Sequence, residues 1–375
     1  MSNEGNNIVA SNIKVFDFFS GCGGTSEGLR QAGMEIVLGI DNDKDSSETF
    51  QNNFNKHFPN VKFINKDIRK IRTEDIGIFV EKYKNNNDLI LFCGCAPCQP
   101  FSAQNKIKDE NDSRIDLLIE FARFVEAYLP DFIFCENVPG MQNVKSTDGP
   151  LTKFIELLQN LGYFIQPPRV VRAEKYGVPQ RRKRLILIAS RLGAIKFPEE
   201  THGNESLPYK TVREAFQDIP SINAGDEHTN KVKYPNHRCA GLNELNLKRI
   251  KSIKEGQGRK DWPKKYQLNC HKNYDGHSDV YGRLKWNEPS VTLTTRCTSI
   301  SNGRFGHPVE DRALSVREAA CLQTFPKDFV FFGSGLGSMA RQVGNAVPVA
   351  LAKIFGKSFV ECAKLYLEAE RNGKV

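Results

Sequence analysis

The sequence predicts an α/β fold in which a parallel sheet is covered by helices on both faces and a smaller, irregular domain follows. Two observations carry this prediction. In the first half of the 375-residue chain, short apolar runs alternate with amphipathic helical segments, as expected for strands buried on both faces. Between residues 192 and 311 the periodicity weakens, and Pro, Asn, His, Gly and Lys become frequent.

The individual elements follow from the same patterns. The predicted strands are residues 15–19, 36–40, 62–64, 89–93, 132–135 and 184–190. The predicted helices are one that ends near Gln31, then residues 43–53, 114–128 and 151–161. Ser315 and Glu318 have the spacing of a capping box, and residues 342–351 predict a turn that leads into a final helix. We therefore expect domains at 1–191 and 192–311, with 312–375 returning to complete the first.

Composition and charge limit the class of protein. A hydrophobic content of 39 % with 26 % charged residues argues against long disorder. The polar first twelve residues predict no signal peptide, and no apolar run approaches the ~18 residues of a membrane span, so we expect a soluble, cytoplasmic protein. The net charge of +9 fits a nucleic-acid partner, or equally a lysine-rich solvated surface.

The ten cysteines, in a chain without a secretory signal, are expected to be reduced thiols. Cys93, Cys95 and Cys98 lack the second pair that a structural zinc site needs. The set His237, Cys239, Cys270 and His271 begins with a gap too tight for such a site. The sequence therefore favours no metal.

A glycine cluster follows the first predicted strand. Ser20-Gly21-Cys22-Gly23-Gly24 lies at a strand-to-helix turn, where a ligand can approach the backbone and an anion can meet helix N–H groups. Ser26 occupies the third glycine position of the dinucleotide fingerprint, so a small carboxylate suits this turn better than a pyrophosphate.

Two acidic residues extend this pocket. Asp41 ends the second strand and is placed to accept hydrogen bonds from two ribose hydroxyls. Asp67 follows residues 62–64 and is placed to hold an adenine amino group. A ribose, an adenine and a carboxylate together describe S-adenosylmethionine.

A cysteine and a glutamate end two later strands. Cys98, between Pro97 and Gln99, follows residues 89–93, and Glu136 follows residues 132–135. Because active sites of open α/β sheets lie at the carboxyl ends of the strands, both side chains are expected in one pocket. A cysteine in such a loop is exposed and reactive more often than one inside a strand.

Motifs along nearly the whole chain resemble the bacterial DNA (cytosine-5-)-methyltransferase family of the restriction–modification type. The motifs stand in the family's order: Asp17–Gly24, Asp41, Asp67-Ile68, Gly94–Ser102, Asp112-Ser113-Arg114, Glu136-Asn137-Val138, Gln180–Arg184, Arg317-Glu318, Leu322–Pro326 and Gln342–Pro348. One such block is a weak signal, whereas all of them in order are specific.

This resemblance implies a Rossmann-like, S-adenosylmethionine-dependent mixed sheet with helices on both faces, and a target-recognition domain that binds double-stranded DNA. Its implied catalytic residues are Cys98, Glu136, Arg182 and Arg184, of which Arg184 contacts the cytosine carbonyl oxygen. The implied cofactor residues are Phe19, Gly21, Cys22, Gly23, Gly24, Asp41, Asp67, Ile68, Pro97, Leu117, Asn345 and Ala346. The implied DNA-binding residues are Gln99, Ser102, Arg283, Thr292, Leu293 and Arg296.

The chemistry accounts for the paired thiol and carboxyl. Carbon 5 of cytosine becomes nucleophilic only after a thiolate adds to carbon 6 of the flipped base. The charge that develops toward nitrogen 3 is then neutralised by a carboxyl group, and Glu136 follows an apolar strand suited to a protonated acid. The base that removes the carbon-5 proton is not identified.

The family pattern is broken at Asn42, where members often carry an apolar or aromatic residue that stacks on adenine. The sequence does not give the recognition site or the effect of Asn42 on cofactor affinity. It also does not say whether a restriction endonuclease acts on the same site, which would not require a stable complex. A monomer is the default expectation. The sequence leaves two alternatives. A tRNA cytosine-5 methyltransferase is disfavoured by the long basic recognition segment. A catalytically dead DNA-binding relative is disfavoured by the presence of Cys98 and Glu136.

Overall fold

The computed structural model describes residues 9–97, 117–140, 149–268 and 279–373, which form two compact units. Unit 1 comprises residues 1–172, 183–200 and 349–375, and unit 2 comprises residues 173–182 and 201–348. These units are structural, and their bounds differ from those of the predicted functional domains. Residues 312–348 belong to unit 2, so the chain returns to the sheet only at Val349.

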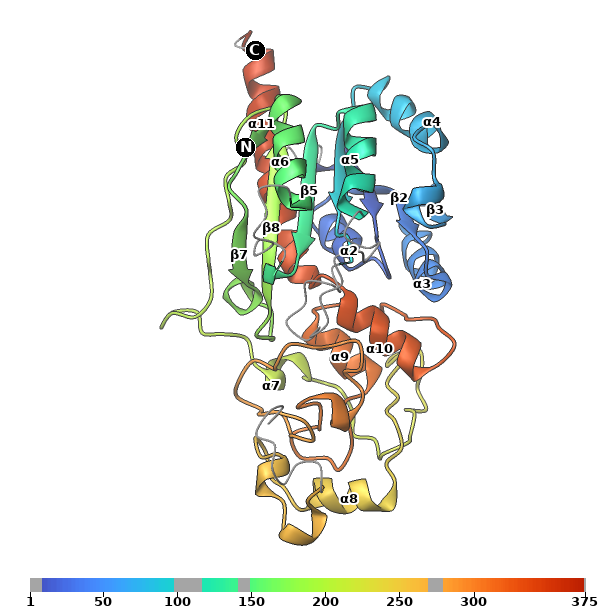
Figure 1. Ribbon diagram of the computed structural model, residues 1–375, viewed down its shortest axis with the longest axis vertical. Coiled ribbons are helices and arrows are strands. Elements are labelled where there is room, and N and C mark those ends of the chain that lie inside the picture. Colours follow the sequence, from blue (N-terminus) through green and yellow to red (C-terminus); the bar gives the residue numbers. More distant parts are fainter. Residues whose placement is uncertain (1–8, 98–116, 141–148, 269–278, 374–375) are drawn as a thin grey trace. The chain divides into compact units, whose positions relative to one another are not determined.

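Unit 1 is built on one eight-stranded sheet of order β3-β2-β1-β4-β5-β8-β6, with β7 also paired to β8 (Figure 1). Its strands are β1 (Ile13–Phe18), β2 (Glu35–Asp41), β3 (Lys62–Asn65), β4 (Leu89–Gly94), β5 (Phe132–Asn137), β6 (Phe164–Ile165), β7 (Arg169–Arg172) and β8 (Lys183–Ser190). The strands β1 to β5 run parallel, whereas β8 is antiparallel to β5, β6 and β7.

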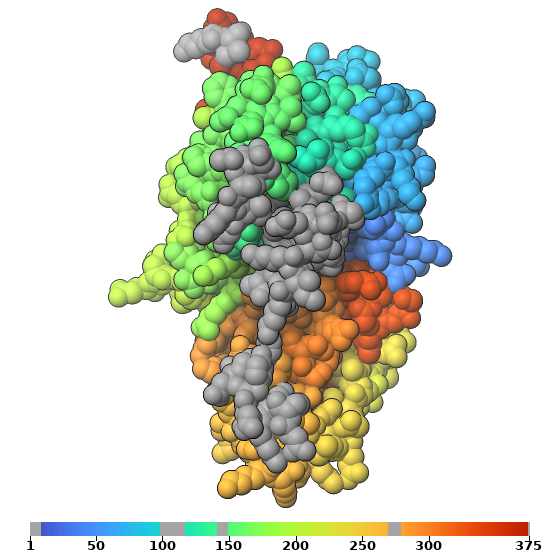
Figure 2. Space-filling model, viewed as in Figure 1, coloured from blue at the N-terminus to red at the C-terminus, as the bar shows by residue number. Residues whose placement is uncertain are grey.

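Helices cover both faces of this sheet. They are α2 (Gly24–Gln31), α3 (Lys44–Phe54), α4 (Glu74–Lys84), α5 (Leu117–Tyr128), α6 (Pro150–Asn160) and α11 (Val349–Arg371), with the short 3-10 turn η1 (Ile68–Lys70) before α4. The atoms of α4, α5 and α6 form the surface of unit 1 on the side shown in Figure 2. On the opposite face α11 packs against α2, and Phe132 and Phe134 of β5 stack on Phe355 and Phe359 of α11.

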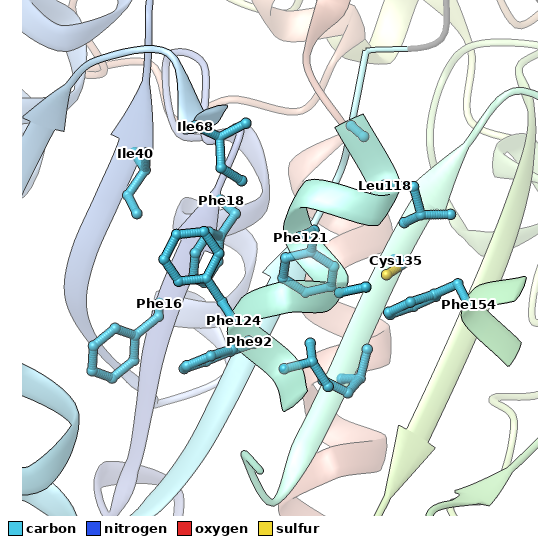
Figure 3. Close-up of a cluster of buried hydrophobic side chains, with 14 of the residues drawn as sticks. Phe16, Phe18, Ile40, Ile68, Phe92, Leu118, Phe121, Phe124, Cys135 and Phe154 are labelled. Carbon is cyan, nitrogen blue, oxygen red and sulfur yellow. The ribbon is translucent and has the colours of Figure 1, made fainter. Parts of the chain in front are cut away.

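Period-two alternation in β5 explains the two covered faces. While Phe132 and Phe134 point to α11, Ile133 and Cys135 join the core beneath α5 and α6. In that core Phe18 contacts Phe92, Phe121 and Phe124 at centroid distances of 5.1 Å each (Figure 3).

The predicted strands and helices of this half are confirmed, with one correction. The mixed sheet implied by the family resemblance is present, but a wholly parallel sheet is wrong, because β8 runs against β5. An apolar run shows that a strand is buried and not which way it runs. Helix α4 and the short strands β6 and β7 were not predicted; β6 and β7 are too short to show a period. The first residues of the predicted 114–128 helix lie outside the described residues.

Unit 2 is mostly irregular. Its elements are η4 (Ala173–Tyr176), α7 (Val212–Ala215), α8 (Glu244–Lys251), η5 (Arg259–Asp261), η6 (Lys264–Tyr266), η8 (Ile300–Asn302), α9 (Val316–Leu322) and α10 (Leu336–Asn345). The predicted capping box is confirmed at the start of α9, where Ser315 caps Glu318 and Glu318 reaches back. In the part of the chain that the structure describes, no helix is long and apolar enough to cross a membrane.

Candidate active site

An ion pair stands at the carboxyl edge of the sheet in unit 1. The Nε atom of Arg184 lies 2.6 Å from Oε1 of Glu136, and both side chains are only slightly exposed, at 13 % and 11 %. The pair presents a carboxylate beside a planar set of donors. Such a pair matches a ligand that carries an acceptor next to a ring nitrogen or an amino group.

The antiparallel strand β8 brings these two residues together. Glu136 is at the end of β5 and pairs in register with Ile186, and Arg184 is near the start of β8. Since β8 runs against its neighbour, its beginning meets the carboxyl ends of the parallel strands. This edge is also the side on which α/β sheets bind ligands.

The neighbouring residue Asn137 ties β5 to the chain after β4. Its Nδ2 atom donates a hydrogen bond of 3.2 Å to the carbonyl oxygen of Ala96, and the Asn137 side chain is buried. Ala96 lies two residues before Cys98, so the chain leading to the predicted nucleophile starts beside Glu136. Asn137 belongs to the Glu136-Asn137-Val138 motif, but this contact was not predicted from the sequence. Cys98, Gln99 and Ser102 lie outside the described residues, and Pro97 is exposed.

The eight described cysteines are unsuited to attack a ligand. They are Cys22, Cys93, Cys95, Cys135, Cys239, Cys297, Cys321 and Cys362. Burial raises the pKa of each of these thiols. Because the thiolate is the nucleophile, none of these eight is an activated nucleophile.

The glycine turn after β1 contacts Asp41. The N–H of Gly21 donates to Oδ2 of Asp41 at 2.9 Å, and the N–H of Asp43 donates to Oδ1 at 2.9 Å. Burial raises the pKa of the Asp41 carboxyl against these hydrogen bonds. Gly21 has a φ of +52° and open space where a side chain would stand, so its backbone is free for a ligand to approach.

The other predicted residues of this turn differ in exposure. Phe19 has the left-handed φ of 59°, rare for an aromatic residue, and is half-buried. Cys22 and Gly24 are buried. At Gly23, with a φ of 94°, an added Cβ would stand 2.4 Å from the ring of Phe54.

A buried hydrogen-bonded pair, Ser26 and Asp17, lies beneath the turn and was not predicted from the sequence. The hydroxyl of Ser26 donates to Oδ2 of Asp17 at 2.5 Å, and both residues are fully buried. Burial raises the pKa of the Asp17 carboxyl to about 7. The available signal was Asp17 between the apolar residues Phe16 and Phe18 of a buried strand.

The predicted adenine-binding residues lie around η1. Asp67 caps this turn, and its carboxylate accepts two hydrogen bonds from the Arg69 side chain, at 2.9 Å and 2.5 Å. Ile68 and Leu117 are both buried in the same hydrophobic core. Asn42, at the end of β2, is exposed.

Arg182 is placed differently from the prediction. In unit 2 its guanidinium is 2 % exposed and donates to the carbonyl oxygens of Leu293, Gly344 and Ala346 at 3.1, 3.1 and 3.3 Å. Such contacts hold the loops of unit 2 together and leave the guanidinium few N–H donors for a substrate. These contacts give Arg182 a structural role in unit 2, and its catalytic role stays a prediction.

Arg283 is buried in unit 2 as well. It is 3 % exposed, and its guanidinium donates to the carbonyl oxygens of Ile250, Ile253 and His307, among other acceptors in unit 2. A buried guanidinium with these partners cannot contact DNA. Arg296, by contrast, is exposed.

The remaining predicted residues of unit 2 lie on one loop and at the end of helix α10. Thr292 is exposed and its hydroxyl donates to the carbonyl of Arg181 at 2.6 Å, while Leu293 is buried and its N–H donates to Gln180 Oε1 at 3.0 Å. Asn345 is exposed and Ala346 is buried.

The side chains weighed for zinc have other partners. The ring nitrogens of His237 contact Ser315 Oγ and the carbonyl oxygen of Pro220, and Cys239 Sγ donates to the carbonyl oxygen of Asn223. Cys270 and His271 lie outside the described residues. Within the described ranges no three His, Cys, Asp or Glu side chains are grouped to hold a metal.

Comparisons with known proteins agree with this geometry. Residues 13–361 match the model of the family described as C-5 cytosine-specific DNA methylase. The chain is 38 % identical to the Type II methylase M.HgiDII of Herpetosiphon aurantiacus, over 92 % of this chain and 94 % of the relative. It is 31 % identical to the Type II methyltransferase M.Eco47II of Escherichia coli, over 94 % and 80 %.

Solved structures share the fold. A candidate DNA modification methyltransferase encoded within an E. coli prophage superposes with a TM-score of 0.70 at 23 % identity, covering 94 % of this chain and 99 % of that one. The methyltransferase EhMeth of Entamoeba histolytica gives a TM-score of 0.59 at 16 % identity, covering 93 % and 98 %.

Proposed function

Since the chain belongs to the C-5 cytosine-specific DNA methylase family, we propose how its own residues carry out methyl transfer to carbon 5 of cytosine in double-stranded DNA. The observation that carries the proposal is the ion pair of Glu136 and Arg184 at the carboxyl edge of the sheet. The pair places the carboxylate of Glu136, a charged acceptor, beside the N–H donors of the Arg184 guanidinium on two paired strands.

Glu136 and Arg184 bind the edge of a flipped cytosine in this proposal. Arg184 donates to the carbonyl oxygen of the base, and the carboxylate of Glu136 faces nitrogen 3. There it takes up a proton from water as the base binds and passes that proton to nitrogen 3, which neutralises the developing charge. Because both side chains are nearly buried, these interactions act away from bulk water, where they are stronger.

Cys98 is the proposed nucleophile. Its sulfur forms a bond to carbon 6, and the π electrons of the carbon 5–carbon 6 bond move to carbon 5, which becomes nucleophilic. Carbon 5 then bonds to the donated methyl group as the bond from that group to its donor sulfur breaks. A base next removes the carbon-5 proton, the electrons of that C–H bond re-form the carbon 5–carbon 6 double bond, the bond from Cys98 sulfur to carbon 6 breaks, and nitrogen 3 returns its proton to Glu136. The raised pKa of the eight described thiols supports this assignment by leaving them protonated.

The residues around Gly21 and Asp41 fit S-adenosylmethionine. The Asp41 carboxylate accepts backbone N–H groups from Gly21, Asp43 and Asn42, and its remaining acceptor capacity is available to a ribose hydroxyl. The open space at Gly21 leaves the backbone accessible, and Asp67 and Ile68 would meet the adenine. When bound, this cofactor supplies an electrophilic methyl group.

We further propose that Arg296 and Thr292 contact the DNA, and that the protein acts as a monomer. Its relatives include Type II methylases. A restriction endonuclease that cuts the same sequence, without forming a stable complex, is the partner that this class implies.

Replacing the nucleophile tests the proposal. The Cys98→Ser variant should bind duplex DNA as tightly as the wild type and transfer no detectable methyl groups to it, measured with radiolabelled S-adenosylmethionine. The matched control is Cys95→Ser, which keeps turnover within about tenfold, because the Cys95 thiol is buried. Normal turnover by Cys98→Ser, or transfer to a matched tRNA in preference to duplex DNA, would contradict the proposal.

A further inference from the structure

One arginine of helix α5 holds both ends of the turn η1. The Nη2 atom of Arg123 donates to the carbonyl oxygen of Ile68 at 3.1 Å and to that of Ile71 at 2.9 Å. Ile68 is the first residue of the turn, and Ile71 caps its end. A single guanidinium therefore spans the whole turn.

The same guanidinium is fixed on its own helix. Its Nε and Nη2 atoms donate to Oε2 of Glu120 at 3.2 and 2.9 Å, and its central carbon lies 4.5 Å from the ring centroid of Phe124. Arg123 thus has little rotational freedom left with which to follow a moving turn. Contacts between α5 and η1 continue in the core, where Ile68, Ile71 and Leu118 belong to one buried cluster.

The turn needs such support. A 3-10 turn of three residues has few hydrogen bonds of its own, and here they are those from Lys70 N–H to the carbonyl of Asp67 and from Ile71 N–H to that of Ile68. Asp67, directly before the turn, is more exposed than the two isoleucines and is ion-paired to the exposed Arg69 side chain. Without an anchor, the position of the Asp67 carboxylate would vary.

We propose that Arg123 is a positioning residue for the adenine end of the cofactor site, acting through the backbone of η1 to fix Asp67 and Ile68. This inference rests on the proposed function, in which those two residues meet adenine. Arg123 itself touches neither the substrate nor the cofactor in this proposal. Its loss should weaken cofactor binding and leave the chemical step unchanged.

The test is a binding titration of the full chain with S-adenosylhomocysteine, together with steady-state kinetics. Arg123→Met removes both carbonyl contacts, and we expect the Kd to rise about 10-fold, the effect of losing a charge-assisted hydrogen bond. The KM for S-adenosylmethionine should rise in parallel, with kcat and the KM for DNA within about twofold. Arg123→Lys keeps the charge and one donor, so it should recover part of the affinity.

Two control variants separate this effect from a general loss of stability. Glu120→Gln removes the ion pair on α5 and leaves both carbonyl contacts. Arg191→Met removes a similar bond, from Nη1 to the carbonyl of Leu129, at the other end of α5. Both should bind S-adenosylhomocysteine like the wild type.

A double-mutant cycle tests whether Arg123 acts through Asp67. In the Asp67→Asn background, Arg123→Met should change the Kd by less than about threefold. Full additivity of the two changes would overturn the proposal, as would wild-type affinity in a folded Arg123→Met variant. If Arg123→Met does not fold, wild-type affinity of Arg123→Lys overturns it instead. If the wild type does not bind S-adenosylhomocysteine, the proposed cofactor is wrong as well. A failure of the Arg123 proposal alone is therefore distinguishable from a failure of the proposed function.

Discussion

The interiors of the two units are filled by different side chains. In unit 1 the largest fully buried side chains are phenylalanines, among them Phe16, Phe18 and Phe92. In unit 2 they are arginines: Arg182, Arg312 and Arg317. The difference follows from how each unit provides hydrogen-bond partners for its backbone N–H and C=O groups.

A sheet pairs its own N–H and C=O groups, so the space between strands and helices can be filled with apolar rings. The irregular loops of unit 2 have no ladder, and buried carbonyls need other donors. Arg317 supplies three, to the carbonyl oxygens of Pro235, Pro326 and Phe329. The five N–H donors of a guanidinium suit this role.

The sequence provides a separate reporter for this comparison. Both tryptophans of the chain, Trp262 and Trp286, lie in unit 2. Tryptophan fluorescence therefore follows the unfolding of unit 2, while circular dichroism is dominated by the helices around the sheet of unit 1.

The largest effect is expected from Arg312→Met. Arg312 and Glu318 form an ion pair at 2.7 Å with 1 % exposure on each side, and removing one partner of a buried pair costs about 3–5 kcal/mol. Urea unfolding followed by tryptophan fluorescence should show this loss. In unit 1, Phe124→Leu should cost about 1–2 kcal/mol, the cost of a modest loss of buried apolar volume. A smaller loss of unfolding free energy in Arg312→Met than in Phe124→Leu would contradict the contrast between the two interiors.

The next prediction concerns pH, because the two units respond with opposite sign. Burial raises the pKa of Asp17 to about 7, so the folded state holds a proton that the unfolded state has released. The stability from Asp17 is complete below pH 3.8 and is lost as the pH rises toward 7. Between pH 5 and 7 the wild type should lose roughly 2–3 kcal/mol relative to Asp17→Asn, at about 1.4 kcal/mol per pH unit. A constant difference between the two proteins would contradict this.

Glu318 in unit 2 behaves in the opposite way. Burial alone would raise its pKa, but the hydrogen bonds and charge of Arg312 outweigh burial and lower the pKa to about 2. Its contribution is therefore present above pH 4.5 and is lost as the pH falls toward 2. The contribution of Asp17 therefore falls at every pH above about 3.8, whereas that of Glu318 is complete only above about 4.5, so the two are never at their maximum together.

A smaller effect separates the two arginines once predicted to contact DNA. Arg296→Ala should reduce the slope of log K against log salt for DNA binding by about 0.9, the contribution of one phosphate contact, with unchanged stability. Arg283→Met should lower the stability of unit 2 and leave that slope as it is, because Arg283 is buried. Gel-shift titrations at several salt concentrations measure the slope, and a reduced slope for a folded Arg283→Met variant would restore its predicted role.

The same comparison explains how far the sequence could be interpreted. The strands of unit 1 were predictable because period and apolar content mark them, and Glu136 could be placed because it ends such a strand. In unit 2 no period exists, and an arginine that binds phosphate looks the same in sequence as one that binds carbonyls. The burial of Arg182 and Arg283 could not be predicted for this reason. Arg184 met Glu136 only through the antiparallel direction of β8, which no local pattern records.

Covalent trapping is the most direct test of the central claim that Cys98, beside Glu136, attacks the target cytosine. Sequencing of DNA from cells that express the protein first identifies the methylated cytosine, and a duplex is made with 5-fluorocytosine at that position. Fluorine cannot leave as the carbon-5 proton does, so the wild type with S-adenosylmethionine should give an adduct that survives a denaturing gel, and Cys98→Ala should give none. An adduct formed by Cys98→Ala would contradict the account.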